Sequence, residues 1–549
     1  MRILFLLAAL ALPLAAQLTP DQRAFEMQSL AATYARNYAP YEWKKQLYNF
    51  DLFDLRPWVA RARASKDDIE FFEIASEYVA SLRDTHTSYF LPSTFVASTG
   101  LHADLYDGKV VIDSINRTLL PLARFPFQIG DEIISADGRP AEELVTYYRK
   151  FSYSGNERSA RRLAALRLVS RAQATIPRAP EVGQNLVLVL KRQSLGTEET
   201  FTIPWNKSGE PVGKLGPVPS PRASEPLLDE IPDYLLPLHH LANESVPSDE
   251  AQDVLNYGSL VQVWAWPAAS RYVARPSNFF RVGIFQTENL RIGYVRIPNF
   301  SPSSQAQALA DLESHIRFFN DNTDGLIIDV MRNTGGSACY NEEVQRRLIP
   351  YNFRGLGREI RANRNWLNSF SNSYESARAN NAEPWVVQTY EVLLAEMKLA
   401  FSETRARTGP LPICSPSLDR VPAAVTYNKP LMVITDEFST SAADGFPAAL
   451  QDARRGPIFG YRTNGAGGTV QDFPTGLYSE GYTRSTIALQ HRQRPVVVEG
   501  YPTTNYVENV GVHPDLPYDY MTLENLLNQG RPFVEAFSKA IAEHVRQNP

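Results

Sequence analysis

Cysteine is scarce in this chain of 549 residues, which contains only Cys339 and Cys414. Two cysteines exclude a framework of several disulfides, the device that stabilises many small secreted domains. The sequence also lacks any cluster of Cys and His at the spacing of a metal site, so we expect no metal. One disulfide in an oxidising compartment and two buried thiols are both compatible with the sequence, which leaves the choice open.

Long apolar runs and stretches of one charge are missing as well. Beyond the first residues, no segment of about 18 uninterrupted apolar residues appears, so the sequence predicts no later membrane-spanning helix. Lys and Arg number 55 against 60 Asp and Glu, which gives a formal net charge of -5. With this balance and no long basic run, nothing argues for nucleic acid as a partner.

The first residues have the layout of a secretory signal. One Arg precedes an apolar run from Ile3 to Leu14, and small residues follow at Ala15 and Ala16. This pattern predicts a signal peptide over 1–16 and a mature chain that starts near Gln17. We therefore expect a secreted or periplasmic protein without a membrane span after cleavage. The alternative is a retained N-terminal anchor.

The rest of the chain changes its periodicity several times. Its length exceeds what one hydrophobic core supports, so several domains are expected. Apolar residues at helical spacing predict a helical domain over 17–92, and alternating strands with an Asp-Gly turn predict a β domain over 93–205. A proline-rich linker or insertion over 206–280 follows. Strands alternating with helices then predict an α/β core over 281–530, before a C-terminal helix over 531–549.

The clearest candidate for chemistry lies where the apolar strand PLMVITDE runs into Ser-Thr-Ser and a helix. Ser441, the last hydroxyl of FSTSA, falls at the start of that helix. Backbone N–H groups and the helix dipole at such a position stabilise a developing oxyanion. Taken alone, the segment is more typical of an ordinary helix N-cap.

Two further segments carry candidate residues. In DGLIIDVMRNTGGSACY, a second buried strand leads to Gly335 and Gly336, whose backbone can approach a ligand closely. We expect one N–H of this pair and the N–H of Ala442 to form the two arms of an oxyanion hole. In LRDTHTSYF, His86 follows a helix and stands between two threonines. Taken singly, an ordinary Gly-Gly turn and a structural histidine are the alternatives.

In their order along the chain, these segments resemble the tail-specific (C-terminal-processing) and tricorn-core serine peptidases. The resemblance rests on L.D.HT, the PDZ-like IGDEIISADGRPAEELV, GLIIDVMRNTGG, VITDEFSTSAAD, TNGAGGTVQ and YVENVGVHPD. It implies a multidomain α+β fold with an N-terminal helical domain, a PDZ-like β domain and an α/β core of the ClpP/crotonase-like kind. The active site is expected at their junction. For the β domain alone, a half-open barrel is the alternative.

Position by position, the resemblance makes Ser441 the nucleophile. Many tail-specific members take a lysine from the loop T.GKGTVQ as general base, but Ala466 stands at that place here. No lysine occurs between Lys429 and Lys539, so a Ser-Lys dyad is not expected. The tricorn branch uses a histidine that matches His86. A neutral imidazole with an ordinary pKa of about 6.5 accepts the serine proton at neutral pH.

The resemblance also implies supporting residues. Glu508 in YVENVGVHPD matches the family's glutamate, and we expect it to support His86 directly or through the hydroxyl of Thr85. A structural salt bridge is the alternative role for Glu508. Asp452 matches the aspartate of the family's LQD segment. Two rival bases match no catalytic motif of the family: His491 and His513.

The predicted function is that of a serine endopeptidase that hydrolyses polypeptide substrates, near their C-termini, without a metal or organic cofactor. The PDZ-like domain is expected to capture an extended tail by β-addition. Two other functions stay open. One is a catalytically inactive peptide- or ligand-binding protein on the same scaffold. The other is an esterase, although the G-x-S-x-G elbow is missing around Ser441.

Overall fold

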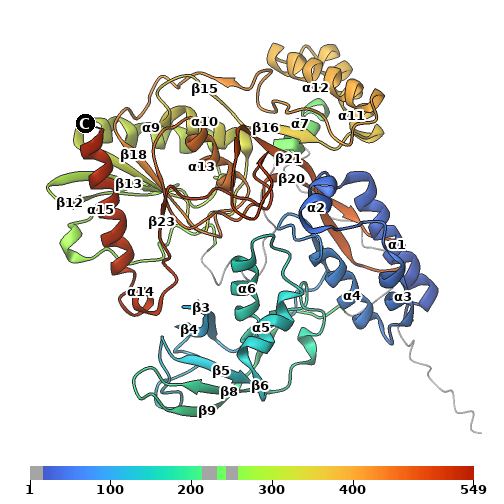
Figure 1. The fold of residues 1–549 in the computed structure, drawn as a ribbon, viewed down its shortest axis with the longest axis vertical. Helices are drawn as coiled ribbons and strands as arrows, with labels where there is room; N and C mark the ends of the chain where they lie inside the picture. Colours follow the sequence, from blue (N-terminus) through green and yellow to red (C-terminus); the bar gives the residue numbers. More distant parts are fainter. Residues whose placement is uncertain (1–16, 213–230, 243–256, 549) are drawn as a thin grey trace, which may run out of the picture.

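The computed structural model describes residues 17–212, 231–242 and 257–548. The predicted signal peptide over 1–16 lies outside these residues. The chain folds into three neighbouring parts, which are the helices of the N-terminal segment, a small β domain and a larger α/β core (Figure 1). This arrangement confirms the predicted multidomain α+β fold. None of the described helices has the length and apolar character needed to cross a membrane.

The N-terminal segment packs four helices around buried aromatic rings. Thr19 and Asp67 begin the first and fourth helices, where their side chains accept hydrogen bonds from backbone N–H groups of the first turn. The short strand after them pairs with β21 (Tyr482–Val496), so the C-terminal half of the chain holds the helices in place. The elements are α1 (Pro20–Asn37), α2 (Tyr41–Tyr48), α3 (Arg56–Ala64), α4 (Asp68–Ala80) and β1 (Ser88–Phe90).

The β domain is a six-stranded sheet with two helices and a second, three-stranded sheet. Asp137 and Gly138 both have positive φ, as the turn between two of its strands requires. Its last strand, β10, comes from the segment predicted as a linker and pairs with β2. The elements are β2 (Val96–Ser98), β3 (Leu101–Tyr106), β4 (Lys109–Ile115), β5 (Glu132–Ala136), β6 (Arg139–Pro140), α5 (Ala141–Arg149), α6 (Glu157–Leu166), β7 (Ser170–Ala172), β8 (Asn185–Lys191), β9 (Glu198–Pro204) and β10 (Asn206–Ser208).

The core is built on a seven-stranded sheet of order β11-β12-β13-β14-β18-β19-β23. Its first three strands are antiparallel and the others parallel. Leu326 and Ile328 face α9, α10 and α13, whereas Ile327 faces α15 on the other side. The elements are β11 (Val273–Arg275), β12 (Arg281–Thr287), β13 (Leu290–Arg296), α9 (Gln305–Asn322), β14 (Gly325–Asp329), α10 (Ala338–Leu348), β18 (Leu431–Thr435), α13 (Ala442–Asp452), β19 (Ile458–Gly460), β23 (Leu516–Pro517) and α15 (Arg531–Gln547).

A second sheet joins the core to the N-terminal helices. The long β21 pairs with β1, β16, β20 and β22, and a helical hairpin packs beside it (Figure 1). Cys339 and Cys414 form a disulfide, which decides between the two alternatives that the sequence left open. The remaining elements are α7 (Leu236–Ala242), β15 (Phe353–Arg354), β16 (Gly357–Ile360), α11 (Arg364–Ala379), α12 (Pro384–Ser402), β17 (Asp419–Arg420), β20 (Gly468–Pro474), β22 (Thr504–Tyr506) and α14 (Leu523–Leu527).

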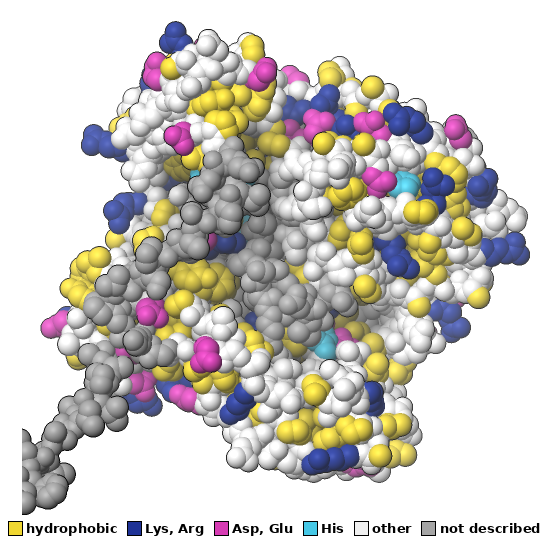
Figure 2. All heavy atoms as spheres, turned by 180° about the vertical axis from the view of Figure 1, so that it is seen from behind, with side chains coloured by type: hydrophobic (Ala, Val, Ile, Leu, Met, Phe, Trp, Pro, Cys, Tyr) yellow, Lys and Arg dark blue, Asp and Glu magenta, His cyan; other side chains and the backbone are white. Residues whose placement is uncertain are grey.

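Charges of both signs share the surface. On the face that Figure 2 shows, Lys and Arg side chains alternate with Asp and Glu side chains and with small apolar patches. This mixture follows from the near balance of 55 basic and 60 acidic residues.

Candidate active site

Ser441 occupies a strained turn between a parallel strand and a helix. Strand β18 ends at Thr435, and Ser441 is the residue before α13, with φ 68° and ψ −114°. A residue other than glycine adopts this conformation only at a cost of about 1–3 kcal/mol, which the surrounding packing must supply. The Ser441 side chain is buried, and its Oγ has no hydrogen-bond partner among the described residues. The turn therefore holds an uncommitted hydroxyl at a helix N-terminus.

The two glycines after β14 lie against this turn. Thr440 donates its backbone N–H to the carbonyl of Asn333 at 3.0 Å, which joins the two loops. A Cβ on Gly335 would lie 2.6 Å from the Ser441 Cβ, so only glycine fits there. The Gly335 N–H already donates to the Asn333 side chain at 2.8 Å. The N–H groups of Gly336 and Ala442 donate to no described residue, and they remain available to a ligand.

The loop over 463–468, where the family carries its lysine, connects the other candidates. The Asn464 N–H donates to the Ser439 carbonyl at 3.0 Å. The Gly467 N–H donates to Glu508 Oε2 at 3.1 Å. Ala466 is buried at the place of the family's lysine. One short loop thus contacts both the predicted glutamate and the turn over 439–441. We call this turn, which carries the predicted nucleophile Ser441, the nucleophile turn.

The segment that carries His86 reaches the same loop from the N-terminal helices through Thr85. His86 is buried, and its backbone N–H donates to Asp84 Oδ1 at 2.9 Å. The neighbouring Thr85 donates its hydroxyl to Asn464 Oδ1 at 2.6 Å. The structure therefore brings His86, Ser441 and Glu508 around one loop, although they come from distant parts of the sequence.

Thr85 makes no hydrogen bond to Glu508 among the described residues, and its role as a relay to His86 stays a prediction. The Thr85 hydroxyl contacts Asn464 and Ser154, and a hydroxyl has a single proton to donate. Glu508 instead accepts a hydrogen bond from Lys44 Nζ at 2.5 Å. Of the two glycines predicted for the oxyanion hole, the occupied N–H of Gly335 leaves Gly336 as the candidate.

Two family models match the chain over the parts just described. Residues 97–213 match a PDZ domain, and residues 291–517 match peptidase family S41. The chain carries an S41 peptidase domain. This match confirms the resemblance to the tail-specific and tricorn-core peptidases, and it identifies the protein as a serine-type peptidase.

Relatives of the whole chain were also found. An uncharacterized protein of Chlamydia muridarum (strain MoPn / Nigg) is 24% identical and covers 93% of this chain and 91% of its own. A protein of Chlamydia trachomatis is 24% identical and covers 88% and 86%. The structure of mature CPAF complexed with lactacystin superimposes with a TM-score of 0.75 at 20% identity, over 96% of this chain and 99% of that chain. At this level of identity, the likeness shows a shared fold.

Three other residues that the sequence singled out also lie in the S41 peptidase domain. Asp452, at the end of α13, accepts two hydrogen bonds from the Arg492 side chain. His491 lies 3.7 Å from Glu359, and burial lowers the pKa of the imidazole. Burial also lowers the pKa of His513, which follows the segment that holds Glu508.

Sequence reasoning missed Asp444, which organises the nucleophile turn. Its carboxylate accepts the N–H groups of Ser441 at 2.7 Å, Gly465 at 2.7 Å and Ala466 at 3.0 Å. Burial raises the pKa of Asp444 from 3.8 to about 6, against these hydrogen bonds. The pattern Ser441-x-x-Asp444 is a local capping signal that could have revealed this residue.

The PDZ domain contacts the nucleophile turn through buried charges. Arg162 of α6 pairs with Glu437, just before the turn, at 2.8 Å and with Asp104 of β3 at 2.6 Å. Arg158, one helical turn earlier, also pairs with Glu437 at 2.6 Å. All but Arg158 are fully buried, so the position of the PDZ domain and that of the turn are mechanically linked.

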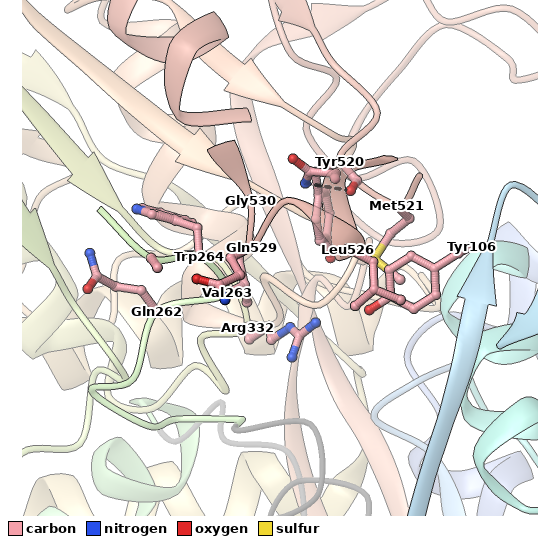
Figure 3. Close-up of a pocket in the computed structure, with 12 residues that line it drawn as sticks. Tyr106, Gln262, Val263, Trp264, Arg332, Tyr520, Met521, Leu526, Gln529 and Gly530 are labelled. Atoms are coloured by element: carbon pink, nitrogen blue, oxygen red, sulfur yellow. Dashed lines mark hydrogen bonds between the residues drawn. The ribbon is translucent and has the colours of Figure 1, made fainter. Parts of the chain in front are cut away.

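A pocket of about 290 Å³ opens between the PDZ domain, the S41 peptidase domain and the C-terminal segment (Figure 3). Among the described residues that line it, Arg332, at the start of the turn that leads to the two glycines, is the only cationic side chain. Tyr106 comes from the PDZ domain and Tyr520 from the C-terminal segment. The lining includes none of the predicted catalytic residues, so this pocket adjoins the candidate site without containing it.

Proposed function

We propose that the protein is an endopeptidase in which Ser441 is the nucleophile, His86 the general base and Glu508 the group that supports the base. The Ser441 Oγ attacks the carbonyl carbon of a peptide bond, and its proton passes to His86. His86 returns that proton to the leaving amine, and water then hydrolyses the ester on Ser441 by the same route in reverse.

The observation that carries this proposal is the conformation of Ser441. A buried serine with positive φ and an Oγ without a hydrogen-bond partner stands at a helix N-terminus beside two unused backbone N–H groups, an arrangement that suits a nucleophile. The N–H groups of Gly336 and Ala442 suit an oxyanion that develops next to the Ser441 Oγ. Preorganised donors of this kind are worth about 3–4 kcal/mol of barrier each.

The choice of base follows from what surrounds the loop over 463–468. Ala466 offers no proton acceptor where the family carries its lysine. His86 lies beside Thr85, which is hydrogen-bonded to that loop, and Glu508 is hydrogen-bonded to its other end. We therefore assign the base to His86 and expect Glu508 to stabilise the imidazolium.

The substrate proposal rests on the PDZ domain. Domains of this type bind extended peptides by adding a strand to a sheet edge. Since Arg162 and Glu437 connect this domain to the nucleophile turn, a bound tail is held close to Ser441. We propose that the enzyme cleaves unstructured polypeptides near their C-termini.

The test is degradation of an unstructured polypeptide by the mature chain, with product ends identified by mass spectrometry. The proposal predicts that Ser441→Ala and His86→Ala each abolish cleavage, and that cuts gather near the C-terminus. Cleavage that persists in His86→Ala would assign the base to another group. Cuts spread evenly along the substrate would contradict the C-terminal preference.

We also propose that the protein acts outside the cytoplasm. The disulfide between Cys339 and Cys414 supports this, because such bonds persist in oxidising compartments. The expected result is a chain that starts at Gln17 in the periplasm or the medium, determined by N-terminal sequencing. A chain that keeps its first residues and stays in the cytoplasm would contradict the proposal.

A further inference from the structure

A lysine from the N-terminal helices reaches the carboxylate of Glu508. Lys44 lies on α2 and is fully buried. Its Nζ donates to Glu508 Oε1 at 2.5 Å, to Asn509 Oδ1 at 2.7 Å and to the Arg83 carbonyl at 2.9 Å. An ammonium group has three protons, and all three are used here. The three acceptors around Lys44 Nζ therefore match the three donors of an ammonium group.

Glu508 needs such a cation because a second carboxylate is close to it. Asp84 accepts hydrogen bonds from the His86 N–H and from the hydroxyls of Thr87 and Thr486. Burial and, after it, the charge of Asp84 raise the pKa of Glu508 to about 8, even though Lys44 and the Gly467 N–H act to lower it. Three tyrosines also interact with this cluster, Tyr38 with both carboxylates, Tyr48 with Glu508 and Tyr34 with Asp84, and burial raises the pKa of each phenol. Lys44 is thus the cation that favours an ionised Glu508.

We infer that Lys44 is a positioning residue for catalysis, which orients the Glu508 carboxyl group toward its role beside His86 and favours its ionised form. The inference rests on the proposed function of Glu508. The Lys44 contacts fix Oε1, and the Gly467 N–H fixes Oε2, so both oxygens are held from opposite sides. A purely structural ion pair would stabilise the fold without influencing the pH at which the enzyme works.

The experiment compares Lys44→Met with Lys45→Met in the full mature chain. Lys45 is the next residue of α2, and its side chain is exposed. kcat and KM for an unstructured polypeptide are measured from pH 6 to pH 10. We expect Lys44→Met to lower kcat about 10- to 100-fold at pH 7 with little change in KM. The acid limb of the profile should move upward by about one pH unit, because Glu508 then protonates more easily. Lys45→Met should leave both unchanged.

Two further variants, Glu508→Gln and the double variant Lys44→Met/Glu508→Gln, test whether Lys44 acts through Glu508. If Lys44 acts through Glu508, adding Lys44→Met to Glu508→Gln lowers kcat no further. This comparison also serves if Lys44→Met alone does not fold, since the double variant buries no unpaired carboxylate at position 508. A double variant that loses a further 10-fold or more would overturn the inference, as would a Lys44→Met enzyme with the parent profile.

The same variants distinguish failure of the inference from failure of the proposed function. A fully active Glu508→Gln enzyme would remove Glu508 from the proposed mechanism, and the inference with it. An impaired Glu508→Gln enzyme beside an unimpaired Lys44→Met enzyme would overturn the role of Lys44 alone.

Discussion

Replacing Asp444 by Asn should lower the activity of the S41 peptidase domain strongly while changing its stability little. The Asp444 carboxylate accepts three backbone N–H groups, from Ser441, Gly465 and Ala466. An Asn side chain has one oxygen and places an N–H₂ group against at least one of these donors. The buried donor that loses its partner costs about 1–3 kcal/mol.

A compensating gain comes from the charge. Burial raises the pKa of Asp444 from 3.8 to about 6, so its ionisation at neutral pH opposes folding. The carboxyl binds more protons in the folded state than in the unfolded state between these values, and stability falls as pH rises through that window. The difference of about 2 pKa units corresponds to about 3 kcal/mol. Asp444→Asn removes this cost, so we expect the free energy of unfolding at pH 7 to change by no more than about 2 kcal/mol.

The assay is urea denaturation at intervals from pH 4 to pH 8, in a Ser441→Ala background that prevents self-cleavage. The stability of the protein with Asp444 intact, relative to that of its Asp444→Asn variant, should fall by about 2 kcal/mol between pH 4 and pH 7 and then stay level. Activity of the Asp444→Asn enzyme with Ser441 intact should drop about 10- to 100-fold, because the nucleophile turn loses an anchor. A stability difference that is flat or rises with pH would refute the reasoning.

Three further predictions concern the framework of the site. Gly335→Ala should abolish activity, because its Cβ would lie 2.6 Å from that of Ser441, whereas Gly138→Ala, also at positive φ but with no atom within 4 Å of its Cβ, should keep it. Arg162→Met should cost about 3–5 kcal/mol of stability, because it leaves the buried Asp104 without its cation and Glu437 with Arg158 alone, whereas the partly exposed Arg161→Met should cost less than about 1 kcal/mol. Replacing both cysteines by Ser should lower the free energy of unfolding by about 2–4 kcal/mol, since the disulfide joins residues 75 positions apart. Equal activity of the two glycine variants, or equal stability of the two arginine variants in urea denaturation, would contradict these expectations. An unchanged urea midpoint without the disulfide would contradict the third.

The fold followed from the sequence where local patterns were strong. Alternating strands and helices indicated the α/β core, and the strand before Ser441 indicated a nucleophile at a helix start. The Asx turn of Asn333 onto the Gly335 N–H was a local signal too, because Asn commonly bonds the backbone two residues on. Attention to that pattern would have favoured Gly336 for the oxyanion hole.

Other features have no local signature. Lys44 and Glu508 are 464 positions apart, and nothing in the sequence of α2 distinguishes Lys44 from Lys45. The pairing of Cys339 with Cys414 likewise depends on how the chain folds back on itself. Tertiary packing alone determines which side chains of distant segments meet, so these contacts could not be predicted from spacing or composition.

The most direct test of the account is covalent labelling of the active site. The mature chain is incubated with a serine-directed acylating probe, and the modified peptide is identified by mass spectrometry. The account predicts one label, on Ser441, which Ser441→Ala abolishes and His86→Ala slows strongly. A label on another residue, or equal labelling of the parent and His86→Ala proteins, would contradict it.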